Sequence, residues 1–382
     1  MVELNGITWR HTRGYLPMVA TAQRFCERNP DVTIRWQARS LQEFADSPLE
    51  QLTAQFDLLV IDHPSVGEAA GRHVLLPLDE WVPSAFLTDQ ARHSVGRSHE
   101  SYFLDGHQWA LAIDAAAPVS GYRKDLLDRT GAEIPRTWSE LVALARRGLV
   151  AVPGLAIDSL MNFYMLCGTI GEEPFQSPDH VVGEDAGIRA LGMMRELLQL
   201  CDPACFGRNP IATWELLSSG DGPVYCPFAY GYSNYSRRGY SNHALATGGL
   251  VPMDTGMPLR STLGGAGLAI SAKCPHKETA GRYAQYVAGA DCQKGLYFYS
   301  GGQPGHRGAW LDGEVNRAAN NFFENTMATL DAAYLRPRFN GYLQFQQQGA
   351  RIVHGYLTAG GDERTALKDL TYALREAQRT KL

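Results

Sequence analysis

The chain has 382 residues, more than a single hydrophobic core usually supports, so two structural units are expected. A net charge of −5 gives no basic surface for nucleic acid, which is therefore not expected as a partner. No run of the sequence approaches the roughly 18 consecutive apolar residues of a membrane-spanning helix. Composition thus argues against a nucleic-acid-binding protein and against a membrane-spanning one.

The N-terminal part of the chain alternates strand and helix patterns. A first strand ends at Trp9, and apolar residues at i, i+4, i+7 and i+8 from Met18 mark one face of a helix. Apolar residues then alternate over residues 32–36, as in a half-buried strand. Residues 56–62 form a nearly continuous apolar run, which is typical of a parallel strand buried on both faces. The order of these patterns predicts an α/β fold.

Polar and aromatic side chains follow two of these strands at the point where each one ends. Trp9, His11 and Arg13 follow the first strand. Asp62 and His63 follow the apolar run. Ligands of open α/β sheets bind outside the carboxyl ends of the strands, so we expect all five side chains to contact a ligand. The alternative for the first group is a core position for its tryptophan and a solvated position for its arginine.

A second succession of strand, turn and helix covers residues 106–148. An apolar strand at 109–113 leads to Asp114, whose carboxylate either accepts hydrogen bonds from ligand hydroxyls or caps the next turn. Gly131 follows a short helix at the position where a left-handed residue is preferred. Residues 137–140 have the T-x-x-E spacing of a capping box, which predicts the start of a further helix.

An aromatic cluster occupies residues 227–235. Its tyrosines, Tyr230, Tyr232 and Tyr235, alternate with Gly, Ser and Asn. This mixture suits the wall of a cleft, where rings stack on a ligand and hydroxyl groups form hydrogen bonds. The alternative is that these rings pack in the core.

Residues 106–148 resemble, nearly position by position, the crossover segment of bacterial extracellular solute-binding proteins that serve sugar-type ABC importers. Residues 75–81 and 263–271 are similar to further elements of that family. The resemblance implies an α/β fold of the class II periplasmic-binding-protein type, with two lobes around a ligand cleft. It also implies that Tyr230 stacks on the ligand and that an aromatic residue of the last third, such as Phe339, contributes to the site.

The strand at 263–271 contains a pair of glycines followed by Ala266. Many sugar-binding relatives carry a tryptophan at that position, so the alanine argues against a sugar ring at this subsite. Gly265 remains a candidate ligand contact, because glycine permits a close approach of the backbone.

The resemblance also predicts the domain organisation. The N-terminal lobe and the C-terminal lobe are each expected to contain two segments, joined by three hinge crossovers. The expected ranges are 1–113 and 262–308 for the N-terminal lobe, 117–258 and 314–382 for the C-terminal lobe, and 113–117, 257–262 and 305–314 for the crossovers.

We expect the protein to be the substrate-binding component of an ABC importer. Hinge closure would capture a small polar solute, a carbohydrate or polyol, between the lobes. The expected partners are this small molecule and an ABC permease in the membrane, and the protein is expected to be a monomer. The sequence contains no phosphate loop, zinc-binding helix or nucleophile elbow, so no catalysis, cofactor or metal is expected.

Two alternatives to this function stay open. Arg13, His11 and His63 could converge at one end of the cleft, opposed by Asp114, and would there suit a carboxylate or other anion. The other alternative is a cytosolic enzyme or sensor that reuses the fold.

The N-terminus and the cysteines bear on the compartment. The chain enters a strand directly, without the basic and apolar segments of a signal peptide. The expected location is periplasmic or extracytoplasmic if a signal peptide was removed, and cytoplasmic if Met1 is the native start. Seven cysteines fit free thiols in cores or in a reducing compartment, and a disulfide between Cys201 and Cys205 is the alternative.

Overall fold

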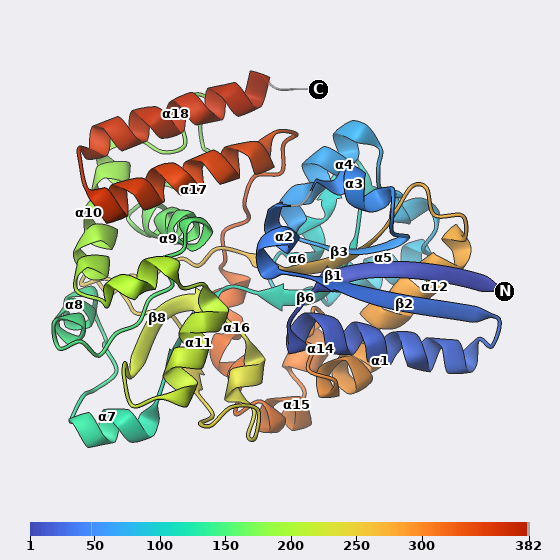
Figure 1. The fold of residues 1–382 in the computed structure, drawn as a ribbon, viewed down its shortest axis with the longest axis horizontal. Coiled ribbons are helices and arrows are strands. Elements are labelled where there is room, and N and C mark those ends of the chain that lie inside the picture. The colour runs from blue at the N-terminus through green and yellow to red at the C-terminus, as the bar shows by residue number, and fades with distance from the viewer. Residues whose placement is uncertain (47, 380–382) are drawn as a thin grey trace.

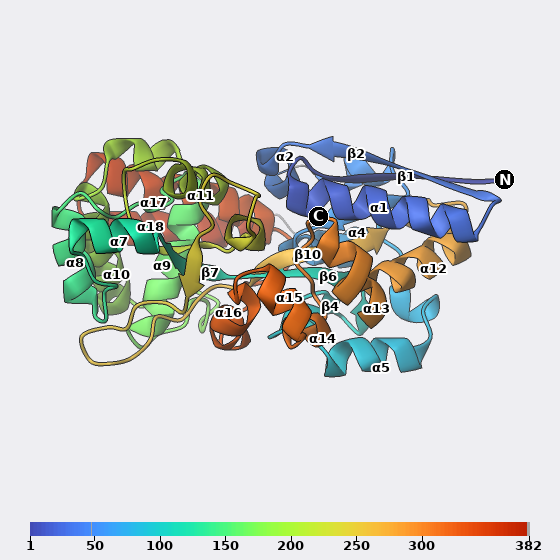
Figure 2. The ribbon, with the colours of Figure 1, turned by 90° about the horizontal axis from the view of Figure 1, so that it is seen from below.

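The computed structural model describes residues 1–46 and 48–379, and its elements form two groups that lie side by side (Figures 1 and 2). The first group is built on a five-stranded sheet of order β2-β1-β3-β10-β6. β1, β2 and β3 run parallel, whereas β10 is antiparallel to both of its neighbours. The strands of this sheet are β1 (Val2–Trp9), β2 (Val32–Arg39), β3 (Leu58–Ile61), β6 (Leu111–Ala116) and β10 (Gly264–Ile270).

Helices surround this sheet, and α1 shows why the chain folds that way. Its apolar residues Met18, Ala22 and Phe25 are buried, as the helical spacing predicts, while Cys26 is only partly buried. β3 is buried along its whole length, as its continuous apolar sequence predicts. The helices of the first group are α1 (Thr12–Arg28), α2 (Leu41–Asp46), α3 (Leu49–Thr53), α4 (Val66–Arg72), α5 (Ser84–Arg92), α6 (Ser98–Ser101), α12 (Lys277–Ala288), α13 (Ala290–Cys292) and α14 (Arg307–Trp310).

The second group contains a three-stranded antiparallel sheet of order β8-β7-β9 and most of the remaining helices. α9 is buried along almost its entire length, and most of its side chains are apolar. The elements here are β7 (Pro118–Tyr122), β8 (Tyr225–Tyr230), β9 (Ala246–Gly248), α7 (Lys124–Thr130), α8 (Trp138–Arg146), α9 (Ala156–Thr169), α10 (Glu184–Gln199), α11 (Pro210–Ser219), α17 (Tyr342–Ala359) and α18 (Glu363–Arg379). Two short helices, α15 (Gly313–Ala318) and α16 (Phe322–Asp331), precede α17. Two-residue strands β4 (Phe103–Leu104) and β5 (His107–Gln108) form a separate hairpin.

The chain passes from the first sheet to the second between β6 and β7, where only Ala117 separates the two strands. It returns to the first sheet with β10, after β9. The predicted lobe boundaries stay predictions. Of those ranges, residue 47 and residues 380–382 lie outside the described residues.

Helix starts and ends in the second group follow local sequence signals. Gly131 ends α7 with a φ of 60°, the left-handed conformation that its position predicts. Thr137 caps α8 by accepting a hydrogen bond from the Glu140 amide. The reciprocal bond of the predicted capping box is shifted by one residue, because the Glu140 carboxylate accepts from the amide of Arg136 instead of that of Thr137. The helix face predicted to be buried is buried.

All seven cysteines are free thiols, so the disulfide between Cys201 and Cys205 does not form. Cys201 lies in the turn after α10, where its Sγ donates to the Leu197 carbonyl. Among the helices of the described ranges, none is both long enough and apolar enough to cross a membrane.

Gly265 occupies a backbone position that a side chain would disturb. Its φ is +112°, and a Cβ there would lie 2.4 Å from the Asp114 carbonyl oxygen. Gly106 has a similar φ of +86°, but a Cβ there would meet nothing within 4 Å among the described residues. A side chain at Gly106 would therefore add backbone strain alone, whereas one at Gly265 would add both strain and steric overlap.

We expect Gly106→Ala to lower the free energy of unfolding by about 1–2 kcal/mol, the cost of a left-handed alanine. Gly265→Ala should cost roughly 2 kcal/mol more, because the new methyl group overlaps the neighbouring strand. Urea denaturation followed by circular dichroism measures both. Equal losses for the two variants would contradict the steric argument.

Candidate functional site

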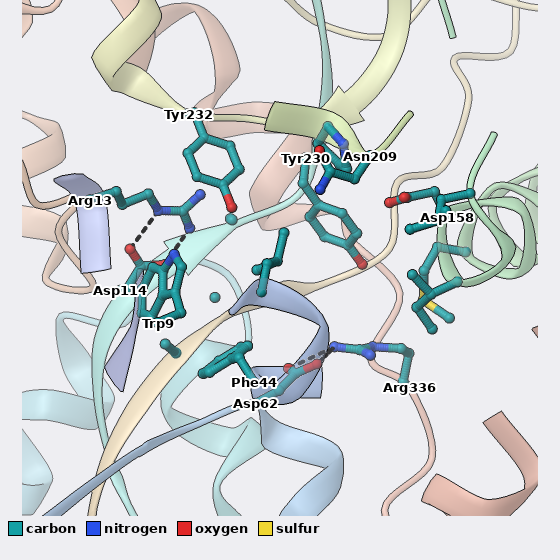
Figure 3. Close-up of a pocket in the computed structure, with 18 of the residues that line it drawn as sticks. Trp9, Arg13, Phe44, Asp62, Asp114, Asp158, Asn209, Tyr230, Tyr232 and Arg336 are labelled. Atoms are coloured by element: carbon teal, nitrogen blue, oxygen red, sulfur yellow. Dashed lines mark hydrogen bonds and ion pairs between the residues drawn. The ribbon is translucent and has the colours of Figure 1, made fainter. Parts of the chain in front are cut away.

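A cavity of about 170 Å³ that is partly open to solvent lies where the carboxyl ends of β1 and β3 face α9 and the end of β8 (Figure 3). At roughly 10–15 Å³ per water position, it has room for on the order of ten water molecules, or for one small ligand. Seven of the eleven residues predicted to bind a ligand line it: Trp9, Arg13, Asp62, Asp114, Tyr230, Tyr232 and Gly265.

A guanidinium–carboxylate pair closes one side of the cavity. Arg13, in the first turn of α1, donates to both carboxylate oxygens of Asp114, from Nε at 2.7 Å and from Nη2 at 2.5 Å. Its Nη1 donates to the Gly231 carbonyl at 2.8 Å, and its guanidinium lies over the Tyr232 ring. Burial alone would lower the pKa of Arg13, but Asp114 raises it overall, so the arginine stays charged. Burial raises the pKa of Asp114 against the pull of Arg13, whose two N–H groups bind the ionised carboxylate.

A second pair lies on another side of the cavity (Figure 3). Arg336 donates from Nη2 to both oxygens of Asp62, each at 2.8 Å, and from Nη1 to Gln346 Oε1 at 3.0 Å. Burial alone would raise the pKa of Asp62, but Arg336 and His63 hold it well below its usual range. Burial would lower the pKa of Arg336, and Asp62 raises it instead. Both groups of this pair are therefore ionised.

Aromatic rings form much of the remaining wall. Trp9 packs against Phe44, with ring centroids 5.1 Å apart. Tyr230 lies against Gly264, where a Cβ would come within 2.5 Å of its ring, and its hydroxyl lies 3.2 Å from Thr262 Oγ1. Such rings offer a flat apolar surface to a ligand and keep water out.

Three lining residues carry buried polar atoms that have no hydrogen-bond partner among the described residues. These atoms are the indole Nε1 of Trp9 and Nε of Arg336, which are donors, and Oδ2 of Asp158. Asp158 lies in the first turn of α9 and points into the cavity (Figure 3). Burial raises its pKa to about 8, so its carboxyl group holds a proton at neutral pH and can both donate and accept.

Two predicted site residues near the first pair do not line the cavity. His11 is the N-cap of α1, and its Nδ1 accepts a hydrogen bond from the Arg13 amide. Burial, with Arg13, lowers its pKa to about 4, so it offers no charge at neutral pH. Tyr235 points away, because its hydroxyl donates to Glu215 Oε1 at 2.7 Å.

His63 and Phe339 also lie elsewhere. His63 is fully buried behind the cavity wall, with Nδ1 3.5 Å from Arg336 Nη2, and burial lowers its pKa to about 4. The three side chains Arg13, His11 and His63 thus do not converge opposite Asp114. Arg13 is paired with Asp114 itself, and His63 lies beside Arg336 in the other pair. Phe339 packs edge-on against Tyr342 and lines a separate outer groove.

Four polar lining residues were not predicted: Asp158, Asn209, Arg336 and Gln346. Two of them carried a sequence signal. Asp158 is the one charged residue of a largely apolar helix. Asn209 precedes Pro210 as an N-cap, where it accepts from the Ala212 amide. Arg336 carried none, since only the tertiary fold brings it beside the end of β3.

Among the described residues, one further cluster has metal-ligand side chains, at Asp89, His93 and His306. It is not part of the cavity wall. His306 Nδ1 accepts a hydrogen bond from the Gly308 amide, so the hydrogen of the neutral ring is on Nε2. That nitrogen therefore has no lone pair free for a metal, and the cluster does not fit a metal site.

The fold is a two-unit α/β architecture whose cavity is lined by residues of both units. The chain belongs to the family of bacterial extracellular solute-binding proteins, whose pattern matches residues 20–323. This membership confirms the resemblance seen in the sequence and implies an extracytoplasmic location.

Solved structures of similar fold cover nearly the whole chain. A maltose-bound MalE3 of T. maritima matches with a TM-score of 0.83 and 20% identity over 98% of this chain and 100% of that one. A solute-binding protein of Agrobacterium radiobacter in complex with ribitol gives 0.79 and 20%, over 99% and 98%. One of Agrobacterium vitis with bound D-mannitol gives 0.79 and 16%, over 99% of each chain. The predicted class II periplasmic-binding-protein fold is confirmed.

One curated relative matches a part of the chain. A mannitol-binding protein of Pseudomonas aeruginosa is 27% identical over 128 residues, which are 32% of this chain. The match spans only 28% of the relative's own length.

The raised pKa of Asp158 predicts a pH dependence of stability. Between the unfolded carboxyl pKa of about 4 and the folded value of about 8, the folded protein holds a proton that the unfolded chain has lost. Stability therefore falls as pH rises through this window. The Asp158→Asn variant lacks this carboxyl group and therefore its contribution to the pH dependence of stability. The contributions of His11 and His63, whose pKa values are also shifted, are the same in the variant and the native protein.

We expect the free energy of unfolding of Asp158→Asn, minus that of the native protein, to grow between pH 5 and pH 8 by up to about 1.4 kcal/mol per pH unit. Urea titrations of the ligand-free proteins at four pH values measure it. The exposed Asp128→Asn is the control and should show a constant difference. A constant difference for Asp158→Asn as well would mean that this carboxyl is ionised.

Proposed function

We propose that the protein is the substrate-binding component of an ABC importer and that it captures a small neutral polyol or carbohydrate. The observation that carries this proposal is the internal neutrality of the cavity. The lining contains two guanidinium groups, and each is already paired with a lining carboxylate. An anionic ligand would have to take an arginine from its aspartate and leave that carboxylate buried and unpaired, which is costly.

Three groups of the wall are left for a ligand. Two of them are uncharged, and the third, Arg336 Nε, belongs to a guanidinium whose charge Asp62 already balances. Trp9 Nε1 is a donor, and the protonated Asp158 carboxyl both donates and accepts. Hydroxyl groups are donors and acceptors too, so a polyol can satisfy both sites without bringing a charge into the cavity. The aromatic wall then packs against the carbon chain or ring face of the ligand.

The names of similar proteins agree in chemical class. The partial curated match is a mannitol-binding protein, and the similar structures hold ribitol, D-mannitol and maltose. The small cavity volume favours a ligand of single-polyol or monosaccharide size.

The mechanism follows from the predicted lobes, residues 1–113 with 262–308 and residues 117–258 with 314–382. Hinge motion at the three crossovers would close them around the ligand, and no bond would be made or broken. The closed form would then present its surface to a permease in the membrane, with the protein acting as an extracytoplasmic monomer.

Calorimetry with D-mannitol, ribitol and succinate tests the proposal. We expect one of the two polyols to bind and succinate not to bind. A saturating polyol should also stabilise the protein, by about 2.7 kcal/mol at a hundredfold excess over Kd. Binding of succinate alone would favour an anion as ligand. Absence of any binding would favour an enzyme or sensor that reuses the fold.

The role of Trp9 can be tested by removing its donor and keeping an aromatic ring. Trp9→Phe should weaken polyol binding by roughly 0.5–1.5 kcal/mol, the net value of one hydrogen bond. Trp36→Phe is the matched control, because the Trp36 Nε1 donates to Tyr283 in the core and does not line the cavity. Equal affinities of Trp9→Phe and the native protein, by calorimetry, would place the indole N–H outside the binding contacts.

A further inference from the structure

Three polar side chains form a continuous hydrogen-bonded chain along one end of the cavity. Asp62 follows β3, Arg336 lies in the segment before α17, and Gln346 lies in the first turns of α17. The arginine donates to the other two, at 2.8 Å and 3.0 Å, and all three line the cavity. Arg336 and Gln346 are almost fully buried. The chain therefore joins the first sheet to the second group of helices across the end of the cavity, and we call it the end wall.

A second hollow lies beyond this end. It is an outer groove of about 770 Å³, lined in part by the rings of Phe175, Tyr334 and Phe339. Among the described residues, Arg336 alone lines both the cavity and the groove. Arg336 is thus the residue at which the cavity and a larger groove with aromatic surfaces meet.

We propose that the end wall fixes the length of the ligand, so that the cavity accepts a single small polyol or sugar and excludes a longer one. This inference rests on the proposed function and adds a specificity-determining role for Asp62, Arg336 and Gln346. In the absence of the wall, a ligand would extend from the cavity into the groove and reach the aromatic residues there. Phe339, which the sequence suggested as a ligand contact, lies on the groove side.

The wall resists a long ligand because its charges are paired, with Arg336 almost fully buried and Asp62 partly buried. Asp62 also accepts a hydrogen bond from the His63 amide, which holds the carboxylate in place from behind. To pass, a ligand would have to separate Arg336 from Asp62 and leave both charges in a buried environment without equivalent partners. A neutral hydroxyl group cannot replace an ionised partner, so the wall holds against the class of ligand that the cavity favours.

Two double variants separate the effect of side-chain size in the wall from the effect of its charges. Asp62→Asn with Arg336→Gln removes both charges and keeps side chains of substantial length. Asp62→Ala with Arg336→Ala removes both charges and opens the partition. Neither leaves an unpaired charge. Arg97→Ala, which removes an exposed guanidinium that lines only the groove, is the control. Thermal melting shows that each variant is folded.

Calorimetry with D-mannitol as the short probe and maltotriose as the long one gives the readout. We expect an affinity for D-mannitol that is about a hundredfold or more above that for maltotriose in the native protein, in Arg97→Ala and in the Asn/Gln variant. In the Ala/Ala variant this ratio of affinities should be smaller by about tenfold or more. Equal preferences in the two double variants would overturn the proposal, as would tight binding of maltotriose by the native protein. If the native protein binds D-mannitol but the Ala/Ala variant gains no affinity for maltotriose, the role of the end wall is refuted and the proposed function stands. Native protein that binds neither probe, nor ribitol, refutes the proposed function together with the wall.

Discussion

The site depends on the pairing of buried charges. Arg13 and Arg336 are each only 4% exposed, and a guanidinium that deep in a protein requires a counter-ion within hydrogen-bond distance. Asp114 and Asp62 supply those counter-ions. The partners of each pair lie far apart in the sequence, so the pairs tie α1 to β6 and the segment before α17 to the end of β3. The cavity has its shape because these distant segments must meet.

The same pairing determines which chemistry is left for a ligand. Once each arginine is bound to its aspartate, the wall contributes hydrogen-bonding capacity but little net charge, and the protonated Asp158 adds none. Aromatic rings fill the intervening surface. The proposed specificity for a neutral polar molecule therefore rests on charges in the wall that are already paired, rather than on an absence of charged residues.

The sequence predicted the parts of the site that follow from strand order. Trp9, Arg13, Asp62 and Asp114 come at or just after strand ends, and the carboxyl ends of strands gather at one edge of a sheet, so their presence in one cavity was foreseeable. The sequence could not show that Arg13 binds Asp114, because pairing depends on the distance between α1 and β6. That one contact argues against the alternative of a free cation facing an anionic ligand.

The contributions of the second group were harder to predict. The periodicity of α9 indicates that all its faces are buried, but not which face meets a cavity, so Asp158 was not foreseen. Arg336 lies outside any helix or strand and has no periodic pattern. Tyr235 and His11 have the residue types of a ligand site, yet their polar atoms are used by Glu215 and by the Arg13 amide. Residue type alone does not distinguish a used hydrogen-bonding group from a free one.

The unused groups give a physical reason for the proposed closure on a ligand. A buried donor or acceptor without a partner costs about 1–3 kcal/mol, and Trp9 Nε1, Arg336 Nε and Asp158 Oδ2 have no partner among the described residues. If the proposed lobes separate, water can reach these atoms, so the penalty would favour opening when no ligand is bound. The proposed polyol would remove the penalty only with the lobes closed on it, and such a difference in affinity shifts a population between two conformations. Trp9 belongs to the first sheet and Asp158 to α9, so a ligand that satisfies both atoms at once has to span the two groups.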